Sequence, residues 1–176
     1  MSLITPKTSF DFETIDKGIH HFKIIETRVD QPAEGKKSGR QFVASCAVVG
    51  GSQEGLRHTE RFFEITKDDF SLSKLAGFCI KIGIIKVGTP IDTVVLQSQQ
   101  FTDKWLKAVK GREFGAKIGW RYADTDRAKE NPYSDMKAYY SMDEYRSLSA
   151  GTEAVAPGST PTPADSLAPA APSIFD

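Results

Sequence analysis

The stretch Arg112–Tyr122 constrains the fold most, because its side chains alternate in character. After Arg112 the even positions are all apolar, whereas the odd positions are charged or glycine. A period of two is what a β-strand with one buried face requires, and a helix would spread these apolar residues around its circumference. The pattern therefore predicts a strand with Lys117 and Arg121 on its outward face. Glycines between cations would let a polyanion backbone come close, although an ordinary solvated face shows the same pattern.

Four further segments have β-strand character and are separated by turns. They are Gly18–Val29, Arg40–Val49, Leu56–Ile65 and Met136–Tyr145. Strand-forming residues dominate the first, one face of the second is apolar, and loops containing proline or glycine follow both. Neither face of the third is cleanly apolar, so its core side stays open. Together with the first stretch, these segments predict five strands.

Between the third and fourth of these strands the apolar period changes to that of a helix. One stripe occupies positions 72, 75, 76, 79 and 80, and a second occupies positions 101, 105, 106 and 109. Such spacing places each set on one helical face. We expect the first helix to be capped by Thr66 and to stop at Gly83. The second helical region should begin at Thr89, before a proline, and stop at Gly111.

The order of elements is therefore three strands, a helical segment and two strands. This is the order of the OB-fold, a five-stranded Greek-key barrel with a helix between strands three and four. We expect a mainly β protein with an OB-fold-like barrel over residues 1–147, although another β-barrel topology fits the pattern too. The OB-fold binds ligands on strands two and three and on two flanking loops. The nucleic-acid-binding candidates on these and neighbouring elements are Lys36, Lys37, Arg40, Arg57, Arg61, Phe63, Lys117, Arg121, Arg127, Lys129, Tyr133 and Tyr139.

Each of these candidates also has a plainer interpretation. The lysine pair in the first loop suits phosphate contacts, and it equally suits a solvated loop. The two arginines of the third strand share a face with Phe63, which suits phosphate contact and base stacking, and they could equally pair with neighbouring acids. Tyr133 lies in an expected loop, and Tyr139 and Tyr140 alternate faces; one of these three is a better stacking candidate than either tryptophan. Both tryptophans lie on apolar stripes and are expected in the core.

No pattern in the chain predicts catalysis, a metal or another cofactor. Cys46 and Cys79 are isolated in apolar surroundings and are expected to be reduced core residues of a cytoplasmic protein. The glycines near position 50 lack the Lys-Ser/Thr of a phosphate-binding loop. Three acids, Asp124, Asp126 and Asp135, could hold Mg²⁺, but such loops are more often simply soluble. No signal peptide or transmembrane stretch is apparent.

The last segment, Leu148–Asp176, differs from the rest in composition. Net charge is zero overall, yet no Lys or Arg follows Arg146, so the preceding body is mildly basic. Five of the nine prolines fall in this segment, at 157, 161, 163, 169 and 172. Such composition predicts a disordered tail. The large apolar side chains at its tip suit a docking motif, made of Ile174, Phe175 and Asp176.

Three motifs resemble those of phage single-stranded DNA-binding replication proteins. They are the run 36–42 (KKSGRQF), the arginines and phenylalanines of 57–63, and the run 111–117 (GREFGAK). The tail resembles that of bacterial single-stranded DNA-binding proteins, but it ends Ile-Phe-Asp where theirs end in Pro-Phe. The resemblance implies a non-enzymatic protein that coats single-stranded DNA in the host cytoplasm. It also implies that replication or recombination partners dock on the tail, and it leaves a homo-oligomer open.

The same sequence fits two other classes of function. One is a protein-interaction or virion-structural β-barrel that binds no nucleic acid. The other is a nuclease accessory subunit that uses the acidic loop between Asp124 and Asp135.

Overall fold

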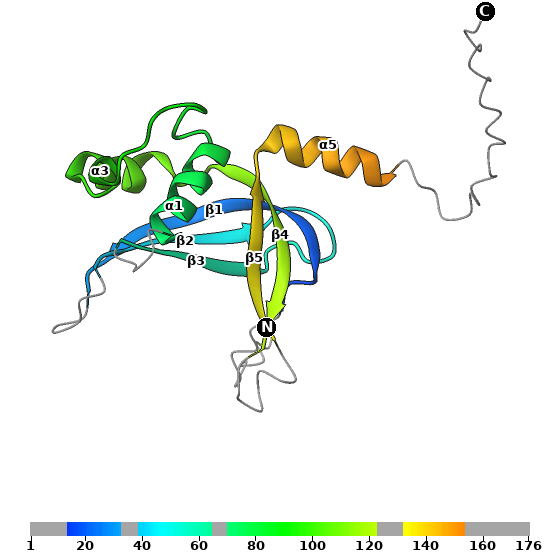
Figure 1. Cartoon of the computed structure of the whole chain (residues 1–176). Helices are drawn as coiled ribbons and strands as arrows, with labels where there is room; N and C mark the ends of the chain where they lie inside the picture. Colours follow the sequence, from blue (N-terminus) through cyan, green and yellow to red (C-terminus); the bar gives the residue numbers. More distant parts are fainter. Residues whose placement is uncertain (1–13, 33–38, 65–69, 123–131, 154–176) are drawn as a thin grey trace, which may run out of the picture.

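The computed structural model describes residues 14–32, 39–64, 70–122 and 132–153 (Figure 1). They form one five-stranded antiparallel sheet with the strand order β3-β2-β1-β4-β5. The strands are β1 (Gly18–Asp30), β2 (Gln41–Val48), β3 (Arg57–Phe63), β4 (Glu113–Arg121) and β5 (Tyr133–Tyr140). The expectation of a mainly β protein with five strands and a helical segment after the third is confirmed.

The long strand β1 joins the two halves of the sheet. Its first residues pair with β4 and its later residues pair with β2, with a register shift between Ile24 and Glu26. A bulge of this kind bends a strand and increases its twist. In Figure 1, β1, β2 and β3 run across the view while β4 and β5 run down it. The sheet is not closed, because β3 and β5 are its two edges and do not pair within the described residues. The five strands expected from the sequence therefore form an open sheet in the described residues.

Four helices complete the described structure, and their starts differ partly from expectation. They are α1 (Phe70–Lys81), α2 (Thr93–Leu96), α3 (Gln99–Ala108) and α5 (Met142–Glu153). Gly83 stops α1 as expected, since its φ of +75° suits glycine. The expected cap Thr66 lies outside the described residues. The second helical region begins later than Thr89, because the side chains of Asp92 and Ser98 cap α2 and α3.

The end of the described chain corrects the sequence-based boundaries. The last strand spans Tyr133–Tyr140 and is followed by α5, whereas a strand was expected over 136–145. The Glu144 carboxylate accepts a hydrogen bond from the Ser141 amide at 2.7 Å, and the Ser141 hydroxyl accepts one from the Glu144 amide at 3.3 Å. This capping box starts a helix where strand-forming aromatics suggested a strand. The proposed tail boundary at Leu148 therefore falls inside α5.

Aromatic side chains fill the space between the curled sheet and the helices. Phe62 of β3 lies against Phe78 of α1, with ring centroids 5.1 Å apart, and against Trp105 of α3 at 5.9 Å. Trp105 is fully buried, as expected, whereas Trp120 is only half-buried and donates its indole N–H to a backbone carbonyl. Both cysteines are buried and free, also as expected. The structure settles the orientation of β3, because its even-numbered residues face the core.

Candidate nucleic-acid interface

The most regular polar surface is the solvent side of β1, β2 and β3, called here the outer face. Antiparallel register places its residues in rows that cross the three strands. One row contains Arg28, Val43 and Arg61, and another contains Lys23, Ala47 and Arg57. The residues of the outer face are Lys23, Glu26, Arg28 and Asp30 in β1, Gln41, Val43, Ser45 and Ala47 in β2, and Arg57, Thr59, Arg61 and Phe63 in β3.

The middle of the outer face is low and its margins carry the cations. β2, the middle strand of these three, contributes the small or short side chains of Val43, Ser45 and Ala47. Val43 is only 1% exposed although it is not part of the core cluster, and the register places arginines on both sides of it. Arginine stems can cover apolar surface in this way while their charged ends stay in water. The result is a shallow surface with basic groups along it.

An exposed aromatic ring lies at one end of the outer face. Phe63, the last residue of β3, is 38% exposed and shares a row with Gln41 and Asp30. Next to it in β3, Arg61 donates to Asp30 and to Gln41, both at 3.4 Å. Phe63 and Arg61 are two residues apart on one strand face, so a strand bound there could stack a base on the ring and place a phosphate near the guanidinium group.

The cations of the outer face differ in how they are paired. Arg28 donates its Nε–H to Asp30 at 2.8 Å, and this carboxylate also receives Arg61. The side chains of Lys23 and Arg57 are exposed and make no hydrogen bond or ion pair with another described residue. Lys23 and Arg57 are thus the cations most available to an incoming anion.

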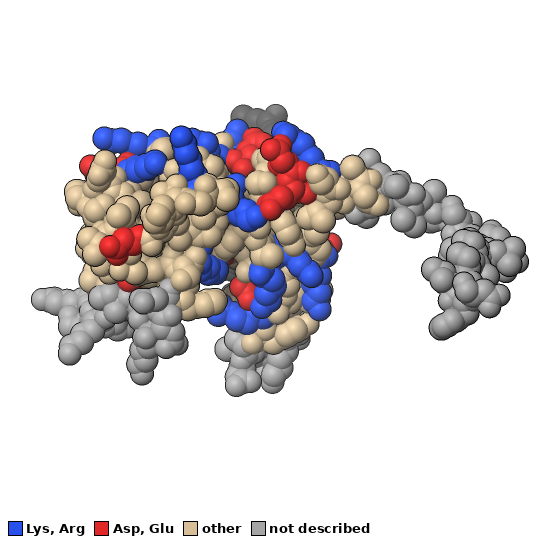
Figure 2. Space-filling model, turned by 45° about the horizontal axis from the view of Figure 1, so that its top comes forward, with Lys and Arg blue, Asp and Glu red and all other residues tan. Residues whose placement is uncertain are grey.

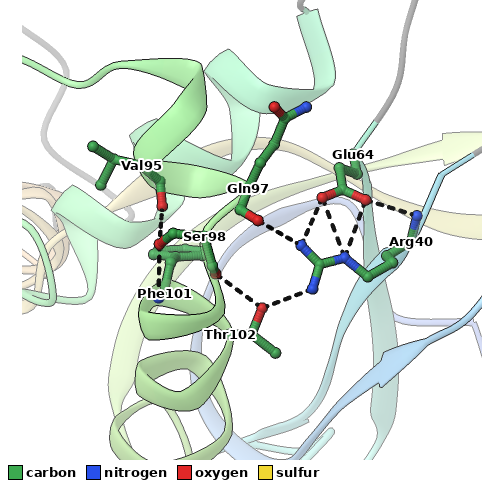
Figure 3. Close-up of polar contacts among 7 residues, drawn as sticks. All are labelled: Arg40, Glu64, Val95, Gln97, Ser98, Phe101 and Thr102. Atoms are coloured by element: carbon green, nitrogen blue, oxygen red, sulfur yellow. Dashed lines mark hydrogen bonds and ion pairs between the residues drawn. The ribbon is translucent and has the colours of Figure 1, made fainter.

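Arg40, a candidate from the sequence, is instead enclosed by its neighbours (Figure 3). Its guanidinium group donates to Glu64 at 2.6 Å, to the Thr102 hydroxyl at 3.0 Å and to the Gln97 carbonyl at 2.9 Å. The hydrogen bonds from Arg40 lower the pKa of Glu64, and Glu64 in turn raises the pKa of Arg40. Arg40 therefore ties the start of β2 and the residue after β3 to the start of α3, and its guanidinium group is already occupied by protein partners.

The candidates on β4 and β5 form a separate surface. Lys117 and Arg121 are exposed on β4, and the Arg121 guanidinium lies 6.0 Å from the ring centre of Tyr133. Tyr133, expected in a loop, is the first residue of β5 and is 47% exposed. Tyr139 points the other way, into the core, where its ring packs 5.0 Å from that of Phe78. This packing makes Tyr139 a core residue rather than an exposed stacking platform.

Two glycines of β4, Gly115 and Gly119, leave space that is filled by the side chains of Tyr145 and Lys137. A Cβ on Gly115 would lie 2.8 Å from the Cβ of Tyr145 in α5, and one on Gly119 would lie 2.8 Å from the Lys137 stem. Tyr145 also packs on His21, with ring centroids 5.4 Å apart. α5 therefore covers the strip between the outer face and the β4–β5 surface. Figure 2 likewise shows basic side chains in separate groups with acidic ones between them.

Four candidates, Lys36, Lys37, Arg127 and Lys129, lie outside the described residues. Sequence reasoning missed three residues of the outer face, Lys23, Arg28 and Asp30. These residues alternate with inward-facing residues along β1, which could have identified them, but the bulge after Ile24 moves the outward-facing positions by one residue.

A buried polar cluster beneath α1 was also not foreseen. Glu60 of β3 is 4% exposed and pairs with Lys74 of α1 and with His58, whose Nε2 lies 3.0 Å from it. Burial opposes ionisation of Glu60, but the hydrogen bonds from His58 and Lys74 outweigh it and leave its pKa below the ordinary value. Nearby, the Tyr139 hydroxyl is buried without a hydrogen-bond partner among the described residues.

An open hollow of about 420 Å³ lies beside α3, with mostly apolar walls that also include Lys86 and Lys104, and none of the candidates lines it. Within the described ranges, no three metal-binding side chains come together and no helix is long and apolar enough to cross a membrane. No family model matches this chain, and no curated protein is similar to it in sequence.

Proposed function

We propose that this protein binds single-stranded DNA on its outer face, without catalysis, in a phage replication or recombination module. The observation that carries the proposal is a combination of three features on one side of β1–β3: exposed cations, the small side chains of β2 and the exposed ring of Phe63. Phosphates would contact the cations and a base would stack on the ring. Such binding tolerates any sequence, which suits a protein that coats exposed strands.

The sheet order supports an open OB-fold-like architecture as part of this proposal. In this sheet, as in the OB-fold, the first strand pairs with the second and the fourth, and a helical segment follows the third strand. The outer face is the solvent side of the strands on which OB-folds bind oligonucleotides. Partner docking on Ile174, Phe175 and Asp176 remains part of the proposal, and these residues lie outside the described ones.

A salt titration of oligo-dT binding tests the proposal. For single strands, log K falls with log salt at a slope of roughly −0.7 per phosphate neutralised. We expect Lys23→Ala/Arg57→Ala to weaken binding and to make the slope shallower by about 1.4, which corresponds to two lost phosphate contacts. The measurement is fluorescence anisotropy of labelled oligo-dT between low and physiological salt, with duplex DNA as a competitor.

The matched control removes the same charge elsewhere. Lys107→Ala/Lys110→Ala changes two exposed cations in and just after α3, away from the outer face. It should shift affinity less and leave the slope nearly unchanged. The proposal fails if the wild-type protein does not bind oligo-dT at low salt. If both double variants change the slope equally, the site is not the outer face.

A further inference from the structure

The carboxylate of Asp30 occupies a position between two guanidinium groups of the outer face. One of its oxygens accepts the Nε–H of Arg28 at 2.8 Å, and the other accepts from Nη1 of Arg61 at 3.4 Å. The two arginines come from β1 and β3, the strands on either side of β2. Neighbouring strands are about 4.8 Å apart, so the arginines start roughly 10 Å from each other and still converge on one anion.

This geometry is that of an anion site. Two oxygens of one anion, each facing a different arginine, are what a phosphodiester group would also present. The three side chains are between 35% and 44% exposed, so a solvent anion can reach them. Phe63 is at the end of the same row as Asp30, where a base attached to the bound phosphate could stack.

We propose that Arg28 and Arg61 form a phosphate site and that Asp30 is a built-in competitor, displaced when a strand binds. The inference rests on the proposed function, since the phosphate is that of the single strand. Ion pairs this exposed are weak, so the carboxylate lowers affinity only a few-fold rather than preventing binding. Its effect is to occupy the two guanidinium groups while the face is empty and to speed the release of bound strands.

The test uses Asp30→Asn in the full chain. Asparagine keeps an acceptor for Arg28 but removes the competing charge. Oligo-dT affinity should rise about three- to fivefold at low salt, and the salt slope should steepen by up to roughly 0.7, for one more phosphate neutralised. The gain should disappear when Arg28→Ala and Arg61→Ala are added to Asp30→Asn.

Glu26→Gln is the matched control, because Glu26 is an exposed acid on the same face without a partner among the described residues. If the two variants gain equally, the effect is general electrostatics and the inference is wrong. If Asp30→Asn weakens binding, Asp30 positions the arginines and does not compete, which also overturns the inference.

A second probe separates this inference from the proposed function. Inorganic tripolyphosphate is titrated into the full chain while the Nε–Hε NMR signals of Arg28 and Arg61 are followed. Shifts of both signals that are larger in Asp30→Asn, in a protein that does not bind oligo-dT, would support the anion site and refute the proposed function. Binding of oligo-dT with neither signal moving would support the proposed function and refute the site.

Discussion

At the scale of single residues, the partners of an arginine decide what it can do. Arg40 immediately precedes β2, and Arg57 is the first residue of β3. From the sequence alone, both arginines are equally good candidates for binding an anion. Arg40 is held by Glu64, Thr102 and Gln97, whereas Arg57 has no partner among the described residues. The first therefore stabilises the fold, and the second is available to a ligand.

Substitution of these two arginines should show the difference. Arg40→Ala should lower the free energy of unfolding by about 2 kcal/mol at neutral pH, because Glu64 keeps its charge in a mostly enclosed position without its partner. Arg57→Ala should change the free energy of unfolding by less than about 0.5 kcal/mol. Urea unfolding of both variants and of the wild type measures these differences.

The lowered pKa of Glu64 predicts how the stability difference between wild type and Arg40→Ala depends on pH. Its folded-state pKa is lowered by Arg40, so the stabilisation is present above the ordinary Glu pKa and is lost as the pH falls through the lowered value. The gap between wild type and Arg40→Ala should therefore shrink below about pH 4. A gap that stays constant to low pH, or an equal loss in Arg57→Ala, would contradict this role for Arg40.

At the scale of elements, α5 lies on β4 because β4 has no side chain at Gly115. Neither Gly115 nor Gly119 has a positive φ, so these glycines provide space rather than a special backbone conformation. Tyr145 occupies the first space and Lys137 the second. The ion pair between Lys81 and Glu144, at 2.5 Å, links the end of α1 to the start of α5.

Gly115→Ala should displace α5 from the sheet. The new Cβ would meet the Cβ of Tyr145 at 2.8 Å, which that residue cannot relieve by rotating its side chain. We expect a loss of about 1–3 kcal/mol in the free energy of unfolding. Backbone amides of α5 should also exchange hydrogen faster, while amides of the β2–β3 pair keep their protection.

Gly119→Ala is the control for this prediction, because its new Cβ meets only the stem of Lys137, which can move. It should cost less and leave exchange in α5 unchanged. Equal exchange in α5 for both variants would mean that Gly115 does not hold the helix in place.

At the scale of the whole molecule, α1 bridges the two edges of the open sheet. Its Lys74 pairs with Glu60 of edge strand β3 and lies 5.9 Å from the ring of Tyr139 in edge strand β5. Phe78, also from α1, packs against Phe62 of β3 and against Tyr139. Side chains of a helix thus connect edges that no backbone hydrogen bonds join.

Lys74→Met should therefore destabilise the protein more than its surface position suggests. Glu60 is 4% exposed and would keep only His58 as a partner, so the free energy of unfolding should fall by about 2–4 kcal/mol. Lys81→Met, in the same helix, removes an exposed pair and should cost less than about 1 kcal/mol. Adding Glu60→Gln to Lys74→Met should recover part of the loss, since no buried charge then remains unpaired. Equal losses for Lys74→Met and Lys81→Met in urea unfolding would contradict the bridging role.

Local sequence patterns were sufficient to predict the elements that depend on neighbouring residues alone. A period of two in 112–122 is enough to specify a strand, and the stripe from position 72 to 80 is enough to specify a helix, because each depends only on which residues share a face. The number of strands and the helical segment after the third followed from such patterns. The start of α5 was also encoded locally, by Ser141 and Glu144, but aromatic residues before it favoured a longer strand.

Which charged residues are available to a ligand, and whether the sheet closes, depend on contacts between segments that are distant in sequence. Arg40 is enclosed by residues 24 to 62 positions away in sequence, and no local pattern reports such partners. Asp30 meets Arg61 only because β1 and β3 are both paired with β2. The core side of β3 depended on a helix that supplies a cation for Glu60. In each case the deciding energy comes from contacts between distant segments, whereas periodicity measures only how neighbours along the chain share a face.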